Sequence, residues 1–544
     1  MSSQTKSPLL VLLPVAFLLL LIPALTVSWV SNLGALGMPL AIAAAFSTTI
    51  WLLLLWWGFH HLAFQIASLF ARPETFSSDE PLEDEVRFIV LYLTCDDFQS
   101  DSFSSCLKQE YPKDLQRVLI GDDSATGKHR DEIDVFLKDY PGVELSRRGS
   151  RAGFKAGNIN TALSEIDLDA STWVILVDAD QILPEDYLAT MADAIRRQPQ
   201  HVAFVQGVNE PDHTLGNDPS GPTINRKATH FQRAMGVGVR LFYSRELTCR
   251  PEYGFVPLLG HGAAIRGSAL RALNGFPRDV SEDYAFALAA RQHDLFGVLN
   301  TNASAWESFP KDFGAYLVRL RKSASGTADL LKGHLGPFVF SGQSRASLVE
   351  RMDAFMLLAW YFVIPFAFIN VYVTSWLCSQ LFISTTYLGV VHPLLPYVFL
   401  VVLAAGLPAL VSVSQSVGEG FKAWFWSTAV TTSALPWAIW WMMVGLWKPP
   451  LFLVTPKGRA RSETFPLAST LIALLGVGTI ALSAIWRSPF SAFIAGHGVA
   501  FFSFPLFHKL NTPSFSGRIA RAVVYIPGFL YLYALYEMWT LARF

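Results

Sequence analysis

Charged residues and cysteines are scarce in this sequence. Asp, Glu, Lys and Arg make up 16% of its 544 residues and 52% are hydrophobic, a balance that excludes an ordinary soluble enzyme. The net charge is −1 and no Lys/Arg cluster alternates with aromatic residues, so a nucleic-acid partner is excluded. The four cysteines form no CxxC pair, which argues against a zinc site and a disulfide framework. We expect reduced thiols at Cys95, Cys106, Cys249 and Cys378.

Long apolar runs flank a charged central block. A helix needs about 20 apolar residues to cross a hydrocarbon core of roughly 30 Å. Two such runs, at 9–30 and 36–58, are separated by the uncharged stretch SNLGALG and predict a helical hairpin. A cleaved signal peptide is the alternative, but its apolar region would be shorter. Further runs lie at 354–384, 390–413, 421–447, 467–486, 489–507 and 521–541.

The positions of Lys and Arg predict the orientation in the membrane. Positive residues in short loops stay on the cytoplasmic side, and the loops SNLGALG and STTYLGVVH have none. We therefore expect a cytosolic central block in a protein of the plasma (inner) membrane. If 421–447 crossed the bilayer, the basic stretch KPPLFLVTPKGRARS would lie outside, so we predict that this Trp-rich run lies along the interface. That leaves seven spanning helices; a true span at 421–447 is the alternative.

The central block alternates short apolar strands with helical stretches. VRFIVLYLT, QRVLIGDDS, STWVILVDAD and HVAFVQGV are the expected strands. This alternation predicts an α/β fold with a parallel, doubly wound sheet. Ligands of such sheets bind at the carboxyl ends of the strands, where this chain has its acidic residues.

Three acidic pairs are candidates for chemistry: Asp122 and Asp123, Asp178 and Asp180, and Glu282 and Asp283. Asp178 and Asp180 can give oxygen ligands to Mg²⁺ or Mn²⁺, and such a cation would neutralise a diphosphate leaving group. A hydroxyl that attacks a sugar's anomeric carbon needs a carboxylate base, for which Asp283, beside Glu282, is the candidate. A solvated turn or a helix cap is the alternative for any single pair.

The order of the motifs carries a resemblance. LIGDDS, RAGFKAGNIN, VDADQILPEDYL and LLGHGAAIRGSALRALNGFPRDVSEDYAFAL follow one another within residues 86–326. They resemble the nucleotide-contacting, KAGN, DxD and acceptor-loop/TED segments of the processive family-2 glycosyltransferases, such as cellulose, hyaluronan and chitin synthases, with Ser281 in place of Thr. The resemblance implies an α/β GT-A glycosyltransferase domain inserted between the transmembrane helices of a multispanning membrane protein.

The resemblance also implies roles for single residues. PPLFLVTPKG resembles the gating loop, FxVTxK, of cellulose synthases, which would place Thr455 and Lys457 near the diphosphate. Alternatively, Lys457 is only a topology determinant that binds anionic lipid. The other implied nucleotide-sugar contacts are Asp122, Asp123, Lys155, Asn158, Asp178, Arg319 and Arg321, and the implied acceptor contacts are Gly260, His261 and Lys322.

One motif departs from the family. QxxRW should fall in FGAYLVRLRKSASG, where Val318 replaces Gln, Arg321 is retained and Lys322 replaces Trp. The family's platform for stacking the acceptor sugar is therefore missing. Leu259 and His261 also depart from the acceptor-loop pattern. These changes indicate a different linkage or acceptor, with the donor half retained.

We therefore predict an inverting, processive transferase that polymerises a β-linked glucan or related polysaccharide from UDP-glucose and moves it across the membrane. A transferase that adds one or a few sugars to a lipid or oligosaccharide is the alternative, and a transporter or scaffold with a degenerate transferase domain is another. Expected partners are the nucleotide-sugar, the growing polysaccharide, membrane lipid and accessory or export subunits.

The expected segments are a transmembrane hairpin (1–71), the catalytic domain (72–326), an interface helix region (327–353), a transmembrane pair (354–413), an amphipathic interface helix (414–447), the gating loop (448–466) and C-terminal transmembrane helices (467–544).

Overall fold

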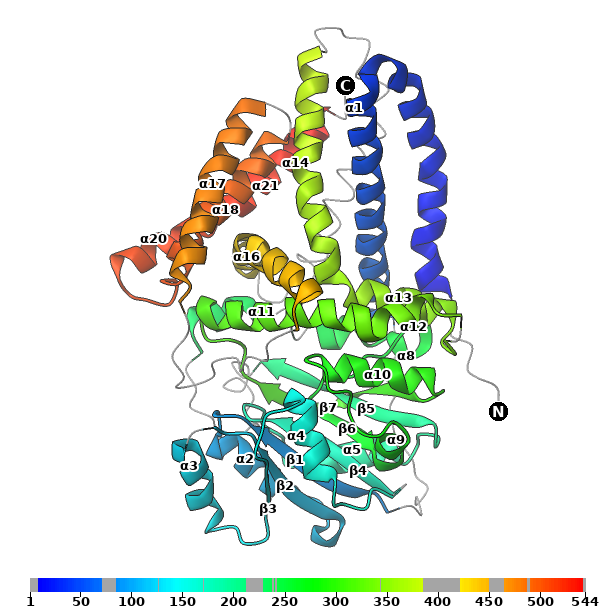
Figure 1. Ribbon diagram of the computed structural model, residues 1–544, viewed down its shortest axis with the longest axis vertical. Coiled ribbons are helices and arrows are strands. Elements are labelled where there is room, and N and C mark those ends of the chain that lie inside the picture. The colour runs from blue at the N-terminus through cyan, green and yellow to red at the C-terminus, as the bar shows by residue number, and fades with distance from the viewer. Residues whose placement is uncertain are drawn as a thin grey trace.

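Figure 1 shows the computed structural model of the chain, in which a layer of helices stands on an α/β domain. The structure describes residues 8–70, 85–125, 127–169, 171–211, 228–236, 239, 242–342, 344–384, 421–449, 464–486 and 490–541. The run at 390–413 and the gating-loop residues Thr455 and Lys457 lie outside these ranges.

The N-terminal helix α1 (Leu9–Ser68) doubles back on itself. Figure 1 shows two antiparallel limbs, and Leu10 and Val11 from its start share a buried cluster with Ala63 and Phe64 near its end. A straight helix of 60 residues would hold its ends about 90 Å apart, so this contact requires the reversal.

Seven strands form one mixed sheet in the order β3-β2-β1-β4-β6-β5-β7. The strands are β1 (Arg87–Thr94), β2 (Gln116–Asp122), β3 (Glu144–Arg147), β4 (Thr172–Asp178), β5 (Val202–Pro211), β6 (Ala263–Arg266) and β7 (Phe296–Glu307). Sequence patterning identified β1, β2, β4 and β5 and missed the other three.

The expectation of a wholly parallel sheet is wrong at β6. This strand runs antiparallel to both β4 and β5. The loop before it passes the carboxyl end of β4, where the amide of Gly262 donates to the carbonyl of Leu176. Because the chain enters β6 from that edge, the strand must run back through the sheet.

Helices cover both faces of the sheet. Ile89 and Leu91 of β1 enter one hydrophobic core, and Val90 and Tyr92 enter another on the opposite face. Because both faces are buried, β1 is apolar throughout instead of alternating. The first core is covered by α4 (Phe154–Leu163), α9 (Gly267–Ala272), α10 (Glu282–Gln292), α12 (Gly336–Phe340) and α13 (Leu348–Leu358), and the second by α2 (Ser100–Leu107), α3 (Gly127–Leu137) and α5 (Tyr187–Ile195).

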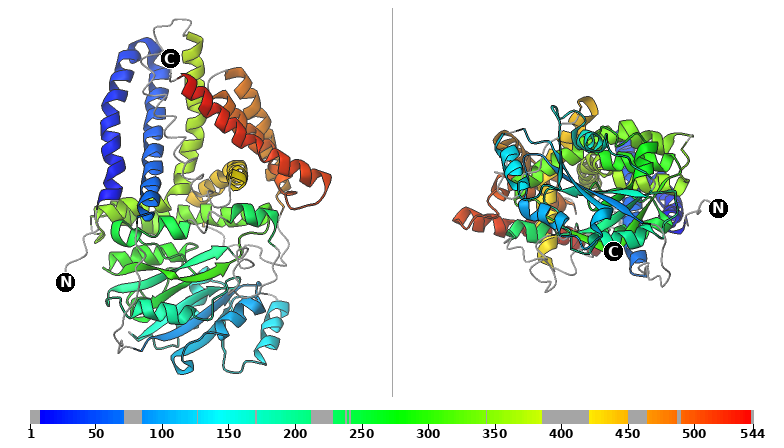
Figure 2. Two further views of the ribbon diagram at one scale, coloured as in Figure 1. Left: turned by 180° about the vertical axis from the view of Figure 1, so that it is seen from behind. Right: turned by 90° about the horizontal axis from the view of Figure 1, so that it is seen from below.

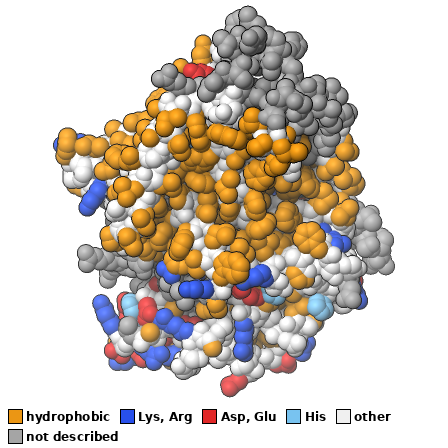
Figure 3. All heavy atoms as spheres, turned by 45° about the horizontal axis from the view of Figure 1, so that its top comes forward, with side chains coloured by type: hydrophobic (Ala, Val, Ile, Leu, Met, Phe, Trp, Pro, Cys, Tyr) orange, Lys and Arg blue, Asp and Glu red, His pale blue; other side chains and the backbone are white. Residues whose placement is uncertain are grey.

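Within the described residues, five helical segments are long and apolar enough to cross a membrane. They are Met38–Ser68 of α1, Trp360–Leu377 of α14 (Trp360–Ser384), Lys422–Trp447 of α16 (Phe421–Trp447), Pro466–Trp486, which is α17, and Phe515–Glu537, which joins α20 (Phe515–Val523) to α21 (Ile526–Leu541). Figure 3 shows hydrophobic side chains over much of this layer, with Lys and Arg gathered below it. The protein is an integral membrane protein.

The run at 489–507, expected to span, is divided in the structure. It forms α18 (Ser491–Phe502) and α19 (Phe504–Phe507), with a break at Ser503. Pro505 follows the break and has no amide proton to continue the helix. With 12 residues, α18 falls short of the roughly 20 needed to cross alone.

Two helices lie across the upright ones. α11 (Phe313–Leu330) runs along the top of the α/β domain, and α16 is seen nearly end-on in Figure 1, where α14 stands vertical; Figure 2 shows the same arrangement from behind. α16 packs on α11, and Trp437 Nε1 donates a 3.0 Å hydrogen bond to the Leu317 carbonyl. α16 is also long and apolar enough to span, so its place along the interface stays a prediction. The expected domain boundary at residue 326 falls inside α11.

A buried ionic cluster joins α1 to the α/β domain. The carboxylate of Asp353 in α13 accepts hydrogen bonds from Arg250 Nε at 3.1 Å and from the Phe255 amide at 2.7 Å, and its Oδ1 lies 2.7 Å from His60 Nε2. His61 pairs with Glu246 at 2.9 Å. Arg250 begins α8 (Arg250–Tyr253), and Glu246 ends a short π-helical turn, η3 (Phe242–Glu246). The second limb of α1 is thus fixed to the segment that leads into residues 254–262.

Candidate active site

The carboxyl ends of β1, β2 and β4 meet at one edge of the sheet. In the strand register Thr94 lies beside Asp122, and Leu93 lies beside both Gly121 and Asp178. Parallel pairing therefore brings together the acidic pairs that follow β2 and β4.

Arginines hold the acidic pair after β2. Oδ2 of Asp122 accepts a 2.7 Å hydrogen bond from Arg147 Nε, and the two carboxylate oxygens of Asp123 each accept a 2.6 Å bond from Arg148. Arg151 donates to the backbone carbonyl of Asp123 at 2.7 Å. Charge-assisted, forked pairs of this kind fix both partners, so the expected nucleotide-contacting loop has a basic rim of three arginines.

Lys155 of α4 connects three parts of the site. Its Nζ donates to Asp178 Oδ1 at 2.6 Å and to the Gly260 carbonyl at 2.7 Å, and it lies 3.9 Å from Glu282 Oε1. Burial works against the charge of Lys155, but the carboxylates of Asp178 and Glu282 outweigh it and raise the pKa of the ammonium. The predicted donor, metal and catalytic residues therefore share one charge cluster.

Burial and mutual repulsion shift the third acidic pair, at the start of α10. Burial, followed by the charge of Asp283, raises the pKa of Glu282 to about 7. Burial also raises the pKa of Asp283, against the opposing effects of the Tyr284 amide and of Lys155, Lys322 and His261. A carboxylate with a raised pKa is a stronger base at neutral pH, as a general base requires.

Gly260 sits directly against Asp283. Its φ is +77°, and a β-carbon placed on it would lie 2.9 Å from Asp283 Oδ2. A larger residue would therefore be strained and would displace the carboxylate.

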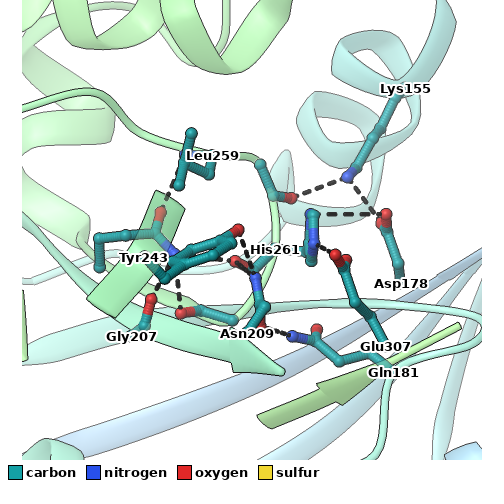
Figure 4. A network of polar contacts seen from close by, with 12 residues as sticks. Lys155, Asp178, Gln181, Gly207, Asn209, Tyr243, Leu259, His261 and Glu307 are labelled. Carbon is teal, nitrogen blue, oxygen red and sulfur yellow. Dashed lines mark hydrogen bonds and ion pairs between the residues drawn. The ribbon is translucent and has the colours of Figure 1, made fainter. Parts of the chain in front are cut away.

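A second network, drawn in Figure 4, surrounds His261. Its Nε2 lies 2.5 Å from Glu307 Oε2 and its Nδ1 lies 3.8 Å from Asp178 Oδ2. Burial opposes the positive charge of His261, but Glu307 outweighs it and raises the pKa of the imidazole. Asn209 of β5 links this region to η3 through a 2.7 Å hydrogen bond to the Tyr243 hydroxyl.

Lys322 faces the carboxylates, and its neighbour Arg321 lies over an aromatic ring. The charge of Lys322 interacts with Glu282, Lys155 and Asp178. The Cζ atom of Arg321 lies 3.7 Å from the centre of the Trp441 ring in α16. Neighbouring residues of an α-helix point about 100° apart, so the two side chains leave α11 in different directions. The structure places Lys322 toward the carboxylates and Arg321 on Trp441, and the expected contact of Arg321 with a diphosphate stays a prediction.

Two further residues have an implied donor contact. Asn158 is buried and donates a 2.9 Å hydrogen bond to the Gly121 carbonyl, so it ties α4 to β2. Arg319 is exposed on α11, with its Cζ atom 5.4 Å from the Phe309 ring centre.

The described residues contain no group of three or more His, Cys, Asp or Glu side chains placed to hold a metal ion. Asp180 is buried and Asp178 already binds Lys155. Two carboxylates still suit a hard cation that takes its other ligands from water and substrate phosphates.

Sequence patterning missed the basic rim and Glu307. The stretch RRGSR, with three arginines in five residues before KAGN, was a usable signal for the rim. Glu307 carries no local signal, because 46 positions separate it from His261.

Two family models match the chain over this region. Residues 97–248 match "Glycosyl transferase family 2", and residues 173–409 match "Glycosyl transferase family group 2". Over these two ranges the chain is similar to family 2 glycosyltransferases. The protein is a glycosyltransferase, and its seven-stranded mixed sheet with flanking helices has the GT-A fold.

Several proteins are similar to this glycosyltransferase. The probable glucomannan 4-beta-mannosyltransferase 1 of Arabidopsis thaliana is 22% identical over 259 residues, which cover 46% of this chain and only 44% of that protein. The mannosyltransferase PcManGT of Pyrobaculum calidifontis, solved with GDP-Man and Mn²⁺, is 17% identical, with a TM-score of 0.43 over 75% of this chain and 99% of that one. S. aureus TarS 1–349, solved with UDP-GlcNAc, is 14% identical, with a TM-score of 0.30 over 62% and 92%.

Proposed function

We propose that this glycosyltransferase inverts the sugar it transfers, with Asp283 as the base. The acceptor hydroxyl loses its proton to Asp283 while its oxygen bonds to the anomeric carbon, and the bond from that carbon to the nucleoside diphosphate breaks. The observation that carries the proposal is the partly buried cluster of Asp283, Glu282, Lys155, Asp178 and Lys322 at the carboxyl edge of the sheet.

The donor half of the site supports a nucleotide-sugar, and UDP-glucose is the donor we propose. Asp122 and Asp123, with the arginines that bind them, would bind the nucleotide. The ion pair with Asp178 would keep Lys155 in position. Asp178 and Asp180 would hold Mg²⁺ or Mn²⁺. When bound, such a cation offsets the charge of a departing diphosphate. Lys322 and Lys155 add positive charge at the same place.

We further propose that the product is a β-linked glucan or related polysaccharide, built repeatedly and moved through the helical layer. The α/β domain would lie in the cytosol below the plasma membrane, with α11 and α16 along its surface. The crosswise placing of these helices between the catalytic cluster and the upright helices supports this arrangement (Figure 1).

A transferase that adds one or a few sugars is the second candidate. Lys322 favours it, because its ammonium faces the carboxylates at the position where a tryptophan would stack a polymer's terminal sugar.

Asp283→Asn tests the base assignment. The amide keeps the size of the side chain but cannot take a proton, so we expect transfer to fall by about 10²- to 10⁴-fold while the binding of UDP stays near that of the wild type. Transfer from radiolabelled UDP-glucose and UDP binding are the two measurements. A variant that transfers at the wild-type rate would reject the assignment. Product length on a gel separates the two candidates.

A further inference from the structure

Among the described residues Arg319 has no acidic partner, unlike the lysine and arginines that hold the acidic pairs. Lys155 pairs with Asp178, Arg147 with Asp122, and Arg148 with Asp123. Within the described part of the chain, Arg319 makes no hydrogen bond or ion pair, and its Cζ atom lies 5.4 Å from the centre of the Phe309 ring. A guanidinium with five donors that no carboxylate occupies is free to bind an anion.

Four tyrosines lie near enough to this guanidinium for its charge to act on their hydroxyls. Its charge acts on Tyr284, directly after Asp283, and on Tyr243, Tyr316 and Tyr361. Burial raises the pKa of Tyr284, and Arg319 opposes that rise. The tyrosines come from α10, η3, α11 and α14, so four elements bring a tyrosine near this guanidinium, and one of these tyrosines directly follows the proposed base.

The same site borders the helical layer. Tyr361 is the second residue of α14, and Tyr316 hydrogen-bonds Thr431 of α16. Phe309 packs beside Tyr316, with ring centres 6.4 Å apart. Arg319 therefore lies on a helix that borders both the α/β domain and the helical layer. Lys322 stands at the position where the family has its stacking tryptophan. This position therefore has no large aromatic ring that could hold a neutral sugar.

We propose that Arg319 and its tyrosines bind the phosphate of a lipid-linked sugar acceptor, whose free hydroxyl then reaches Asp283. This inference rests on the proposed transfer reaction at Asp283 and not on the length of the product. Arg319 would be a specificity-determining residue on the acceptor side. It would not contact the donor.

Two small acceptors test the proposal with the full-length protein in detergent. Glucosyl octyl phosphate and octyl β-glucoside share the sugar and the alkyl chain, and only the first has a phosphate. With radiolabelled UDP-glucose as donor, we expect a KM about ten- to a hundredfold lower for the phosphate acceptor, as hydrogen bonds to a charged group would give. Arg319→Ala should bring the ratio of the two KM values to about one, and Arg319→Lys should keep part of it.

Arg345→Ala is the matched control. Arg345 is exposed and pairs with Asp294 at 2.9 Å, away from the site, so the wild-type ratio should remain. Equal KM values in the wild type, or a ratio that survives Arg319→Ala, would overturn the proposal. An octyl glucuronide acceptor as good as the phosphate one, and equally dependent on Arg319, would replace the phosphate with a carboxylate and also overturn it.

The proposed function fails in a different way. If Asp283→Asn transferred sugar to both acceptors at the wild-type rate, the base assignment would be lost even where the phosphate preference held. If neither acceptor took sugar from UDP-glucose, UDP-GlcNAc or GDP-mannose, both proposals would be rejected.

Discussion

Removing the charge of Lys155 should move the pH dependence of transfer upward. The Lys155 ammonium lies 3.9 Å from Glu282 Oε1. At an effective dielectric constant of about 20, two charges about 4 Å apart interact by about 4 kcal/mol, which corresponds to about three pKa units. Since Lys322 remains near Glu282, part of this loss is offset, and we expect Lys155→Met to raise the pKa of the acidic pair by about one to three units.

The sign follows from the role of the pair. Asp283 must be deprotonated to act as base, so transfer increases as the pH rises through the pKa of the pair, which for Glu282 is about 7. A positive neighbour favours the carboxylates. In Lys155→Met the proton is therefore held to higher pH, and transfer at pH 8 should be roughly tenfold lower, with recovery toward pH 9 to 10.

The assay is kcat at saturating donor between about pH 5.5 and 10. Lys155→Arg keeps the charge and should keep the wild-type midpoint. So should Lys138→Met, since Lys138 is an exposed residue directly after α3 and takes no part in the charge cluster. A Lys155→Met profile that is lower at every pH but has an unchanged midpoint would refute the electrostatic argument. It would leave Lys155 as a positioning residue.

Two further changes test the fold around the site. Gly260→Ala should lower kcat by at least about tenfold, because Gly260 has a positive φ and its new methyl group would lie 2.9 Å from Asp283 Oδ2, whereas Gly149→Ala, in open space, should have no effect in the same assay. Asp353→Ala leaves the fully buried Arg250 without its carboxylate and should cost about 3–5 kcal/mol of stability, seen as a lower midpoint of thermal unfolding in detergent; an unchanged midpoint would show that Arg250 finds another partner.

The sequence by itself determined the class of the protein and the edge of the sheet that carries the chemistry. Apolar runs of about 20 residues predict membrane helices from length alone. Buried strands contain continuous apolar runs, such as the WVILV that precedes Asp178. Parallel pairing then places the residues that follow these strands side by side. For this reason the clustering of Asp122, Asp178 and Lys155 could be foreseen from motif order.

Only the tertiary structure decided which side chains face that cluster. Lys322 and Arg321 are neighbours in the sequence, and the packing of α11 against α16 sends one to the carboxylates and the other to Trp441. The reversal of β6 depends on the route of residues 254–262, and the pairing of His261 with Glu307 joins residues 46 positions apart. A local sequence pattern shows the hydrophobic period and the secondary-structure propensity of one segment. These contacts depend instead on how whole elements pack against one another.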